Sequence, residues 1–201
     1  MLPNFRVSFL ALTVCSILSG CGGSNDKTVA TNPTPVNPTP VAKAKNVIFM
    51  LGDGYGMTTM TAARIYKVGE DGELTLDTLP ETAFVKTFSN DAQVTDSAPS
   101  MAAYMTGVKM NNEVISMSTD TSARSSSGVD YVAKTGDSTC PEGNGKAVQT
   151  LLELFKSKGM PVGVVTTTRI THATPADTYA HICHRDGENA IAAQLTPNGA
   201  G

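Results

Sequence analysis

The sequence contains no tryptophan, and aromatic residues make up only 5% of its 201 residues. Charged residues are also few, at 16%, with 15 Lys and Arg against 18 Asp and Glu and no basic run. This balance excludes the positive patch that attracts nucleic acid, so no nucleic-acid partner is expected. Hydrophobic residues make up 40% and glycines number 18, which is typical of a folded α/β protein with many tight turns.

Cysteine and histidine are scarce, and their spacing limits the metal sites that the chain forms alone. There are four cysteines and three histidines, and the absence of a C-x-x-C pair disfavours a cysteine zinc site. For Cys140 and Cys183, both a disulfide and two buried thiols stay open. His181 and His184 have the spacing of one helix face, but without a third local ligand a solvated or capping role is favoured over a metal site.

The first 20 residues have the layout of a secretory signal, which is removed from the mature protein. Arg6 precedes the apolar run VSFLALTVCSIL, which is too short to span a bilayer. The segment LSGC at residues 18–21 resembles the lipobox of bacterial lipoproteins, in which the cysteine carries the lipid. We therefore expect an exported protein, anchored by lipid at Cys21 to a bacterial membrane and facing the periplasm or the cell surface. An ordinary secretory signal is the alternative.

Residues 21–44 are rich in Pro, Thr and Asn, and NPTPV occurs twice in them. Proline lacks a backbone donor and favours an extended polyproline II chain, so this segment is predicted to be a tether. The folded body is expected to occupy residues 45–201.

The folded region begins with the pattern of a strand followed by a helix. The apolar run Val47–Leu51, closed by Gly-Asp-Gly, predicts a strand buried on both faces, and residues 57–67 have helical spacing. Asp53 then lies at the carboxyl end of a strand, where ligand sites of open α/β sheets gather. A turn residue that satisfies its own backbone is an equal alternative.

Two further segments complete the prediction of an α/β fold. Residues 81–88 alternate between polar and apolar side chains, as in a half-buried strand. The apolar spacing within residues 147–159 predicts a helix, and residues 160–168 predict another strand. Strands that alternate with helices favour a mainly parallel sheet flanked by helices.

A serine stands at the start of the motif TDSAPSMAAYMTG, residues 95–107. Pro99 suits the first turn of a helix and Gly107 suits its end, so Ser97 lies at the positive end of a helix dipole, which favours an anion. The hydroxyl is either a helix cap or a nucleophile. As a nucleophile it needs a base or a metal to remove its proton.

Four motifs occur in the order seen in alkaline phosphatases: NVIFMLGDGYG, TDSAPSMAAYMTG, VGVVTTTRITHATPADTYAH and HRD. Residues 45–195 therefore resemble the N-terminal part of such an enzyme. The resemblance implies an alkaline-phosphatase-like fold, and hydrolysis of phosphate monoesters to inorganic phosphate through a phosphoserine. It further implies two zinc ions, one magnesium ion and a homodimer.

The resemblance also assigns roles to residues of the site. Ser97 matches the nucleophile and a zinc ligand, Arg185 matches the guanidinium that holds two phosphate oxygens, and Asp96 orients that arginine. On the metal side, Asp53 matches the carboxylate that bridges zinc and magnesium. Thr174 matches a hydroxyl ligand to magnesium. His172 occupies a metal-site position that other members fill with aspartate or histidine. An imidazole there disfavours magnesium and favours a third zinc.

The family takes most of its zinc ligands from its C-terminal half, and no matching pattern occurs here. We therefore expect the chain to be the incomplete N-terminal portion of a longer enzyme, inactive by itself. Two alternatives stay open. The first is a sulfatase-type or phosphodiesterase member of the same superfamily, although Met101 stands where the sulfatase pattern needs arginine. The second is a lipid-anchored surface binding protein that catalyses nothing.

Overall fold

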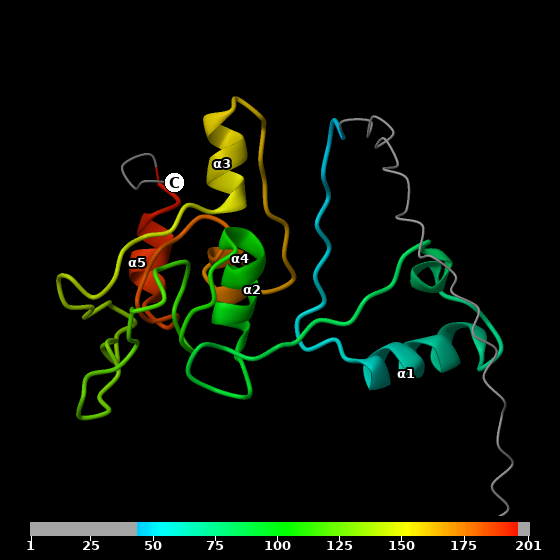
Figure 1. Ribbon diagram of the computed structural model, residues 1–201, viewed down its shortest axis with the longest axis horizontal. Helices are drawn as coiled ribbons and strands as arrows, with labels where there is room; N and C mark the ends of the chain where they lie inside the picture. Colours follow the sequence, from blue (N-terminus) through cyan, green and yellow to red (C-terminus); the bar gives the residue numbers. More distant parts are fainter. Residues whose placement is uncertain (1–43, 197–201) are drawn as a thin grey trace, which may run out of the picture. The chain divides into compact units, whose positions relative to one another are not determined.

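The computed structural model describes residues 44–196 (Figure 1). The predicted signal segment, residues 1–20, and the predicted tether up to residue 43 lie outside this part. Of the described residues, 49–196 belong to one compact unit, and the helices described below all lie in it. Among the described residues no helix is long and apolar enough to cross a membrane.

The first helix confirms the prediction for residues 57–67. Helix α1 spans Met57–Val68 and ends at a glycine with φ 79°, a backbone conformation that favours glycine. None of its residues is buried. The short 3₁₀ helix η1, Thr75–Thr78, follows, and Asp77 in it accepts a hydrogen bond from Arg64 of α1 at 3.1 Å (Nε to Oδ2).

Helix α2 spans Ser97–Thr106, as the motif around the serine predicts. Asp96 caps it, because its Oδ1 accepts a hydrogen bond from the Ala98 amide at 2.8 Å. Gly107 ends it with a left-handed φ of 73°. The side chains of α2 that face the interior include Met101 and Met105, both buried.

Helix α3 spans Leu151–Ser157, so it begins four residues later than the apolar pattern from residue 147 suggests. A capping box explains the start: the Thr150 hydroxyl accepts from the Glu153 amide at 3.2 Å, and Glu153 Oε2 accepts from the Thr150 amide at 2.8 Å. Helix α4, Ala173–Ala176, contains the Thr174-Pro175 pair and lasts a single turn. Helix α5 spans Glu188–Ala193.

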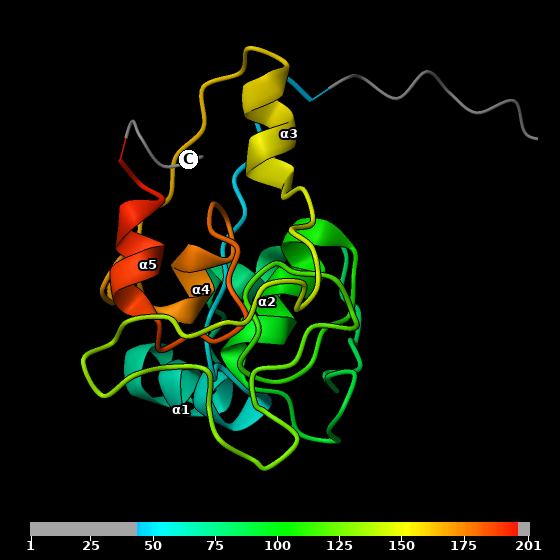
Figure 2. The same ribbon diagram turned by 90° about the vertical axis from the view of Figure 1, so that its left-hand side faces the viewer.

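Helix α2 packs against α4 and α3, and both views show α2 beside α4 (Figures 1 and 2). Small side chains permit this close packing. Ala98 of α2 and Ala176 of α4 are fully buried in one cluster with Ile115 and Ile191. Full burial of an isoleucine stabilises a fold by about 1.5–3 kcal/mol. This cluster fixes the first turn of α2 against the first turn of α4, and both turns carry predicted site residues.

The predicted parallel sheet is not confirmed, because residues 44–196 contain isolated antiparallel bridges and no strand. The prediction that the first apolar run is a strand buried on both faces is wrong for this part of the chain: the Met50 side chain is 90% exposed. Phe84 and Val165, in the other predicted strands, are 90% and 99% exposed. An apolar run becomes a buried strand only when neighbouring strands pair with its backbone, and the described residues supply none.

The connection between α2 and α3, residues 107–150, is held to the segment after α4 at two points. Ile115 and Ile182 form an antiparallel bridge, with both backbone hydrogen bonds at 3.0 Å. Cys140 and Cys183 form a disulfide with a Cα–Cα distance of 5.9 Å, which answers the question that the sequence left open. Both links lie within a few residues of Arg185.

Candidate active site

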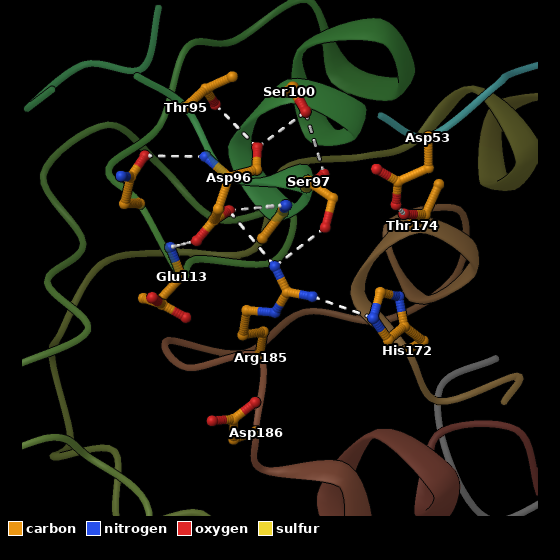
Figure 3. Close-up of polar contacts among 12 residues, drawn as sticks. Asp53, Thr95, Asp96, Ser97, Ser100, Glu113, His172, Thr174, Arg185 and Asp186 are labelled. Carbon is orange, nitrogen blue, oxygen red and sulfur yellow. Dashed lines mark hydrogen bonds and ion pairs between the residues drawn. The ribbon is translucent and has the colours of Figure 1, made fainter. Parts of the chain in front are cut away.

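Ser97 is the first residue of α2, and its hydroxyl contacts a guanidinium from a distant part of the chain. Arg185 NH1 donates a hydrogen bond to Ser97 Oγ at 2.9 Å, although the two residues are 88 positions apart (Figure 3). The neighbours Ala98 and Pro99 are buried, which fixes the first turn, whereas Ser97 itself is half-buried and accessible. The positive end of the helix, a hydroxyl and a guanidinium therefore meet at one point, an arrangement that favours a bound anion.

The Asp96 carboxylate is oriented by backbone amides on both of its oxygens. Oδ1 accepts from Ala98 N at 2.8 Å, and Oδ2 accepts from Glu113 N at 2.8 Å. Oδ1 also lies 3.7 Å from Arg185 NH1. The aspartate that caps α2 thus faces the same guanidinium nitrogen that donates to Ser97, so it restricts the orientation of Arg185.

Arg185 makes its second side-chain contact through the other terminal nitrogen. NH2 donates to His172 Nε2 at 3.2 Å (Figure 3). Because an arginine nitrogen only donates, Nε2 is the acceptor and the imidazole proton belongs on Nδ1. His172 Nδ1 is buried and has no hydrogen-bond partner among the described residues. The Arg185 side chain is only 16% exposed, so both of its contacts are partly shielded from water.

Asp53 and Thr174 form a second pair beside this group. Thr174 Oγ1 donates to Asp53 Oδ2 at 2.7 Å across 121 positions of sequence. Both residues line a cleft of about 560 Å³, together with Met101 of α2. A larger hollow of about 690 Å³ lies along α3 and contains none of the predicted site residues. The cleft with the two oxygen side chains is therefore the one relevant to the predicted chemistry.

The six predicted site residues lie around one region (Figure 3). His172 caps α4 and Thr174 lies in its only turn, so α4 connects the guanidinium group to the Asp53 pair. Within residues 44–196, however, no group of three or more His, Cys, Asp or Glu side chains is arranged to hold a metal ion. Metal binding by these residues thus requires further ligands.

Of the two roles expected for the neighbouring histidines, solvated or capping, His184 takes the capping one. His184 is buried, and its Nδ1 accepts from Asp186 N at 3.2 Å. His181 lies 2.7 Å from the Ser116 carbonyl through Nδ1 and 2.9 Å from Glu153 Oε1 through Nε2. Burial raises the pKa of Glu153, but the hydrogen bonds from His181 and Thr150 outweigh it and leave that pKa lowered. Neither histidine lies in a helix, so the sequence spacing gave a false helix face.

Glu113 is a site residue that the sequence did not indicate. Its amide donates to Asp96 Oδ2 at 2.8 Å, and its carbonyl accepts from the Arg185 amide at 2.7 Å. Its φ is 71°, a left-handed conformation that is uncommon for glutamate. No turn residue marks this position, and only the two preceding asparagines hint at a tight turn.

The geometry can be compared with known proteins. A family model for alkaline phosphatase matches residues 44–200. The tissue-nonspecific alkaline phosphatase of Homo sapiens is 42% identical over 149 residues, which cover 71% of this chain and 26% of that protein. The chain therefore spans about a quarter of the length of this relative.

Solved structures give the same relationship. The alkaline phosphatase of the Antarctic bacterium TAB5 matches with a TM-score of 0.53 and 28% identity, over 70% of this chain and 33% of that chain. A histidine variant of that enzyme with Mg bound in its M3 site also has a TM-score of 0.53, at 27% identity, with the same coverage. The chain belongs to the alkaline phosphatase family.

Proposed function

We propose that a protein containing this chain hydrolyses phosphate monoesters, with Ser97 as the nucleophile and a phosphoserine as the intermediate. The single observation that carries the proposal is the 2.9 Å hydrogen bond from Arg185 NH1 to Ser97 Oγ at the amino end of α2. A guanidinium and a helix terminus are the two protein groups best suited to a phosphate. The human and Antarctic relatives, both alkaline phosphatases, support this substrate class.

The reaction follows from the position of the hydroxyl. Ser97 Oγ releases its proton to solvent and forms a bond to phosphorus, while the phosphorus–oxygen bond of the ester breaks and the leaving oxygen takes the electron pair and then a proton from solvent to give the alcohol. Water then attacks phosphorus, the bond to Oγ breaks, and inorganic phosphate leaves as the serine hydroxyl is restored. Each displacement inverts the configuration at phosphorus, and the covalent step divides one difficult hydrolysis into two easier displacements.

Arg185 holds the phosphoryl group during both displacements. Its two terminal nitrogens point to Ser97 and His172, so they present a planar fork to an anion that lies between those residues. Asp96 keeps the fork in this orientation from the side of α2. The arginine thus contributes binding and orientation of the phosphoryl group.

The donor atoms of the site suit divalent cations in part. Asp53 and Thr174 supply two adjacent hard oxygens, the ligand type that Mg²⁺ prefers, and His172 supplies an imidazole, a common ligand of zinc. We propose that Asp53, Ser97, Thr174 and His172 contribute to a centre of two zinc ions and one magnesium ion, with further ligands from elsewhere in the protein. When bound, such cations lower the pKa of a neighbouring hydroxyl and balance phosphate charge.

The sulfatase alternative lacks its basic residue at position 101. Met101 is buried in α2 and lines the cleft beside Asp53, so an apolar side chain occupies the place where the sulfatase pattern has arginine.

We also propose that the protein is exported, lipid-anchored through Cys21 at the bacterial periplasmic membrane or cell surface, and homodimeric. Membrane fractionation of a Cys21→Ser variant tests the anchor, and light scattering tests the dimer.

The test of the proposed function compares two serines of α2 in the full-length protein that contains this chain. Ser97→Ala should reduce hydrolysis of p-nitrophenyl phosphate at alkaline pH by several orders of magnitude, because no other hydroxyl replaces the nucleophile. Ser100→Ala is the matched control, since within residues 44–196 the Ser100 hydroxyl bonds only to the backbone carbonyls of Asp96 and Ser97. It should stay within about threefold of the parent enzyme, in keeping with the loss of one neutral hydrogen bond.

Phosphate trapped in acid should appear on Ser97 by mass spectrometry of peptides. Full activity in Ser97→Ala, or phosphate on another side chain, would reject the mechanism. Absence of hydrolysis in the parent protein with zinc and magnesium supplied would favour the surface-binding alternative instead.

A further inference from the structure

Glu113 connects the two charged partners of Ser97 through its own backbone. Its amide binds the Asp96 carboxylate at 2.8 Å and its carbonyl binds the Arg185 amide at 2.7 Å. A single residue in the left-handed conformation, with φ 71°, therefore sets the spacing between Asp96 and Arg185. A residue with a Cβ atom is strained in this conformation, whereas glycine is not. The backbone geometry alone therefore does not explain why the residue is a glutamate.

The Glu113 carboxyl group lies among charged neighbours of the anion site. In Figure 3 Glu113 is on the opposite side of Arg185 from His172. Burial raises the pKa of Glu113, and Asp96 and Asp186 raise it further, whereas His184 and Arg185 lower it. Arg124 NH2 is 3.9 Å from Oε1, and the side chain is 26% exposed. No hydrogen bond to its carboxylate oxygens is formed by any described residue, and the 3.9 Å ion pair with the half-exposed Arg124 compensates the negative charge only in part.

This charge opposes the anion that Arg185 is placed to hold. Arg185 is already faced by the Asp96 carboxylate at 3.7 Å, and that contact suffices to orient its guanidinium. A second carboxylate nearby adds no orienting hydrogen bond to Arg185, but it lowers the positive potential at the phosphate position. Unit charges that are several ångströms apart and largely screened by water change binding by roughly threefold to tenfold.

We propose that Glu113 is a positioning residue of the phosphate site that acts through Arg185 and weakens the retention of inorganic phosphate. The inference rests on the proposed function, because it assigns Arg185 to phosphate. Its backbone fixes the distance between Asp96 and Arg185, and its carboxylate keeps the site from holding the product anion too tightly. The same carboxylate also weakens the affinity of the site for phosphate monoesters.

The sign of the change in affinity separates this role from a merely structural one. If the Glu113 side chain only supported Arg185, its removal would loosen the guanidinium and raise the inhibition constant of phosphate. If the carboxylate opposes the anion, its removal lowers that constant. Replacement by glycine also relieves the left-handed strain, so it removes the charge while the backbone contacts are kept.

The experiment uses the full-length enzyme loaded with zinc and magnesium, at alkaline pH. Glu113→Gln and Glu113→Gly should both lower the inhibition constant of inorganic phosphate and the KM for p-nitrophenyl phosphate by roughly threefold to tenfold. Glu113→Asp, which restores the charge, should bring both constants back towards the parent values. The difference should shrink at high ionic strength, because salt screens partly exposed charges. Glu142→Gln, an exposed glutamate of the connection between α2 and α3, is the matched control and should change neither constant.

A raised or unchanged phosphate inhibition constant in both Glu113→Gln and Glu113→Gly would overturn the proposal. So would tighter binding in the glycine variant alone, which would assign the effect to the backbone. The outcome is separable from the proposed function: hydrolysis by the parent enzyme and its loss in Ser97→Ala test that function, whatever the Glu113 variants do.

Discussion

Thr174 donates a hydrogen bond to Asp53 at 2.7 Å, and this contact joins the first motif of the chain to the single turn of α4. Thr174 is the second residue of that turn, which packs against α2. The pair therefore couples the oxygen donors of the proposed metal centre to the helix that carries the nucleophile.

The Thr174 hydroxyl should be necessary for the response of the enzyme to magnesium. Thr174→Val keeps the shape of the side chain but removes the oxygen, so it leaves Asp53 without its partner and removes one proposed ligand. We expect a roughly 10- to 100-fold loss of apparent magnesium affinity. Thr174→Ser keeps the hydroxyl and should stay close to the parent. The measurement is phosphatase activity of the zinc-loaded enzyme during a magnesium titration, and equal curves for the valine and serine variants would contradict the role.

Arg185 should affect substrate binding more than the chemical step. Arg185→Ala removes a charge-assisted fork worth about 1.5–3 kcal/mol, so the KM and the phosphate inhibition constant should rise roughly 10- to 100-fold. The kcat should fall by a smaller factor. Arg185→Lys keeps the charge without the planar fork and should recover only part of the affinity. Steady-state kinetics checks the split, and a loss confined to kcat would be inconsistent with a binding role.

Local sequence patterns predicted the helices better than the sheet, for a physical reason. Helix α2 is determined by its own residues, since Asp96 supplies the cap and Gly107 the stop. A strand depends on partners remote in sequence, and the apolar runs around Met50 and Val165 find none among residues 44–196. The apolar spacing places the start of α3 too early, at residue 147. The capping box formed by Thr150 and Glu153 sets the actual start at Leu151.

The predicted site residues carry recognisable motifs, and the structure brings them together. Ser97, Arg185 and Thr174 were all named from such motifs, and their contacts now join segments far apart in sequence. Glu113 was not predicted because its hydrogen bonds to Asp96 and Arg185 are made by backbone groups, which every residue type possesses. Its left-handed conformation, in turn, follows from tertiary contacts. The burial of His184 could not be predicted for a related reason: the exposure of a side chain is set by the whole fold.

The disulfide should stabilise the fold and hold the Arg185 segment. It closes a separation of 43 residues, for which removal costs about 2–4 kcal/mol. Cys140→Ser, Cys183→Ser and the double variant should each lower the free energy of unfolding by that amount in urea denaturation. Reductant should destabilise the parent protein and leave the double variant unchanged. If reductant has no effect on the parent, the pair does not form in solution.

Because Cys183 lies two residues before Arg185, the phosphate inhibition constant should also rise in the variants.

Asp177 directly follows α4 and is fully buried. Its Oδ1 accepts from Ser116 N at 3.0 Å, whereas its Oδ2 has no hydrogen-bond partner among the described residues. Burial raises the pKa of Asp177 well above its usual value, and the hydrogen bonds from Ser116 only partly offset this. The folded protein therefore binds this proton more tightly than the unfolded chain does.

The raised pKa of Asp177 gives the stability of the protein a definite pH dependence. The contribution is complete below the unfolded pKa of about 3.9 and is lost as pH rises towards the folded pKa, because the buried carboxyl must then ionise. Asp177→Asn is neutral at every pH and keeps an oxygen for the Ser116 amide. The variant should lose less stability than the parent as pH rises from about 4 to 8, and it should be the more stable of the two at neutral pH. Urea denaturation across this range checks the prediction, with Asp71→Asn as the exposed control. Parallel profiles for the parent and the Asp177 variant would mean that Asp177 does not hold a proton in the folded state.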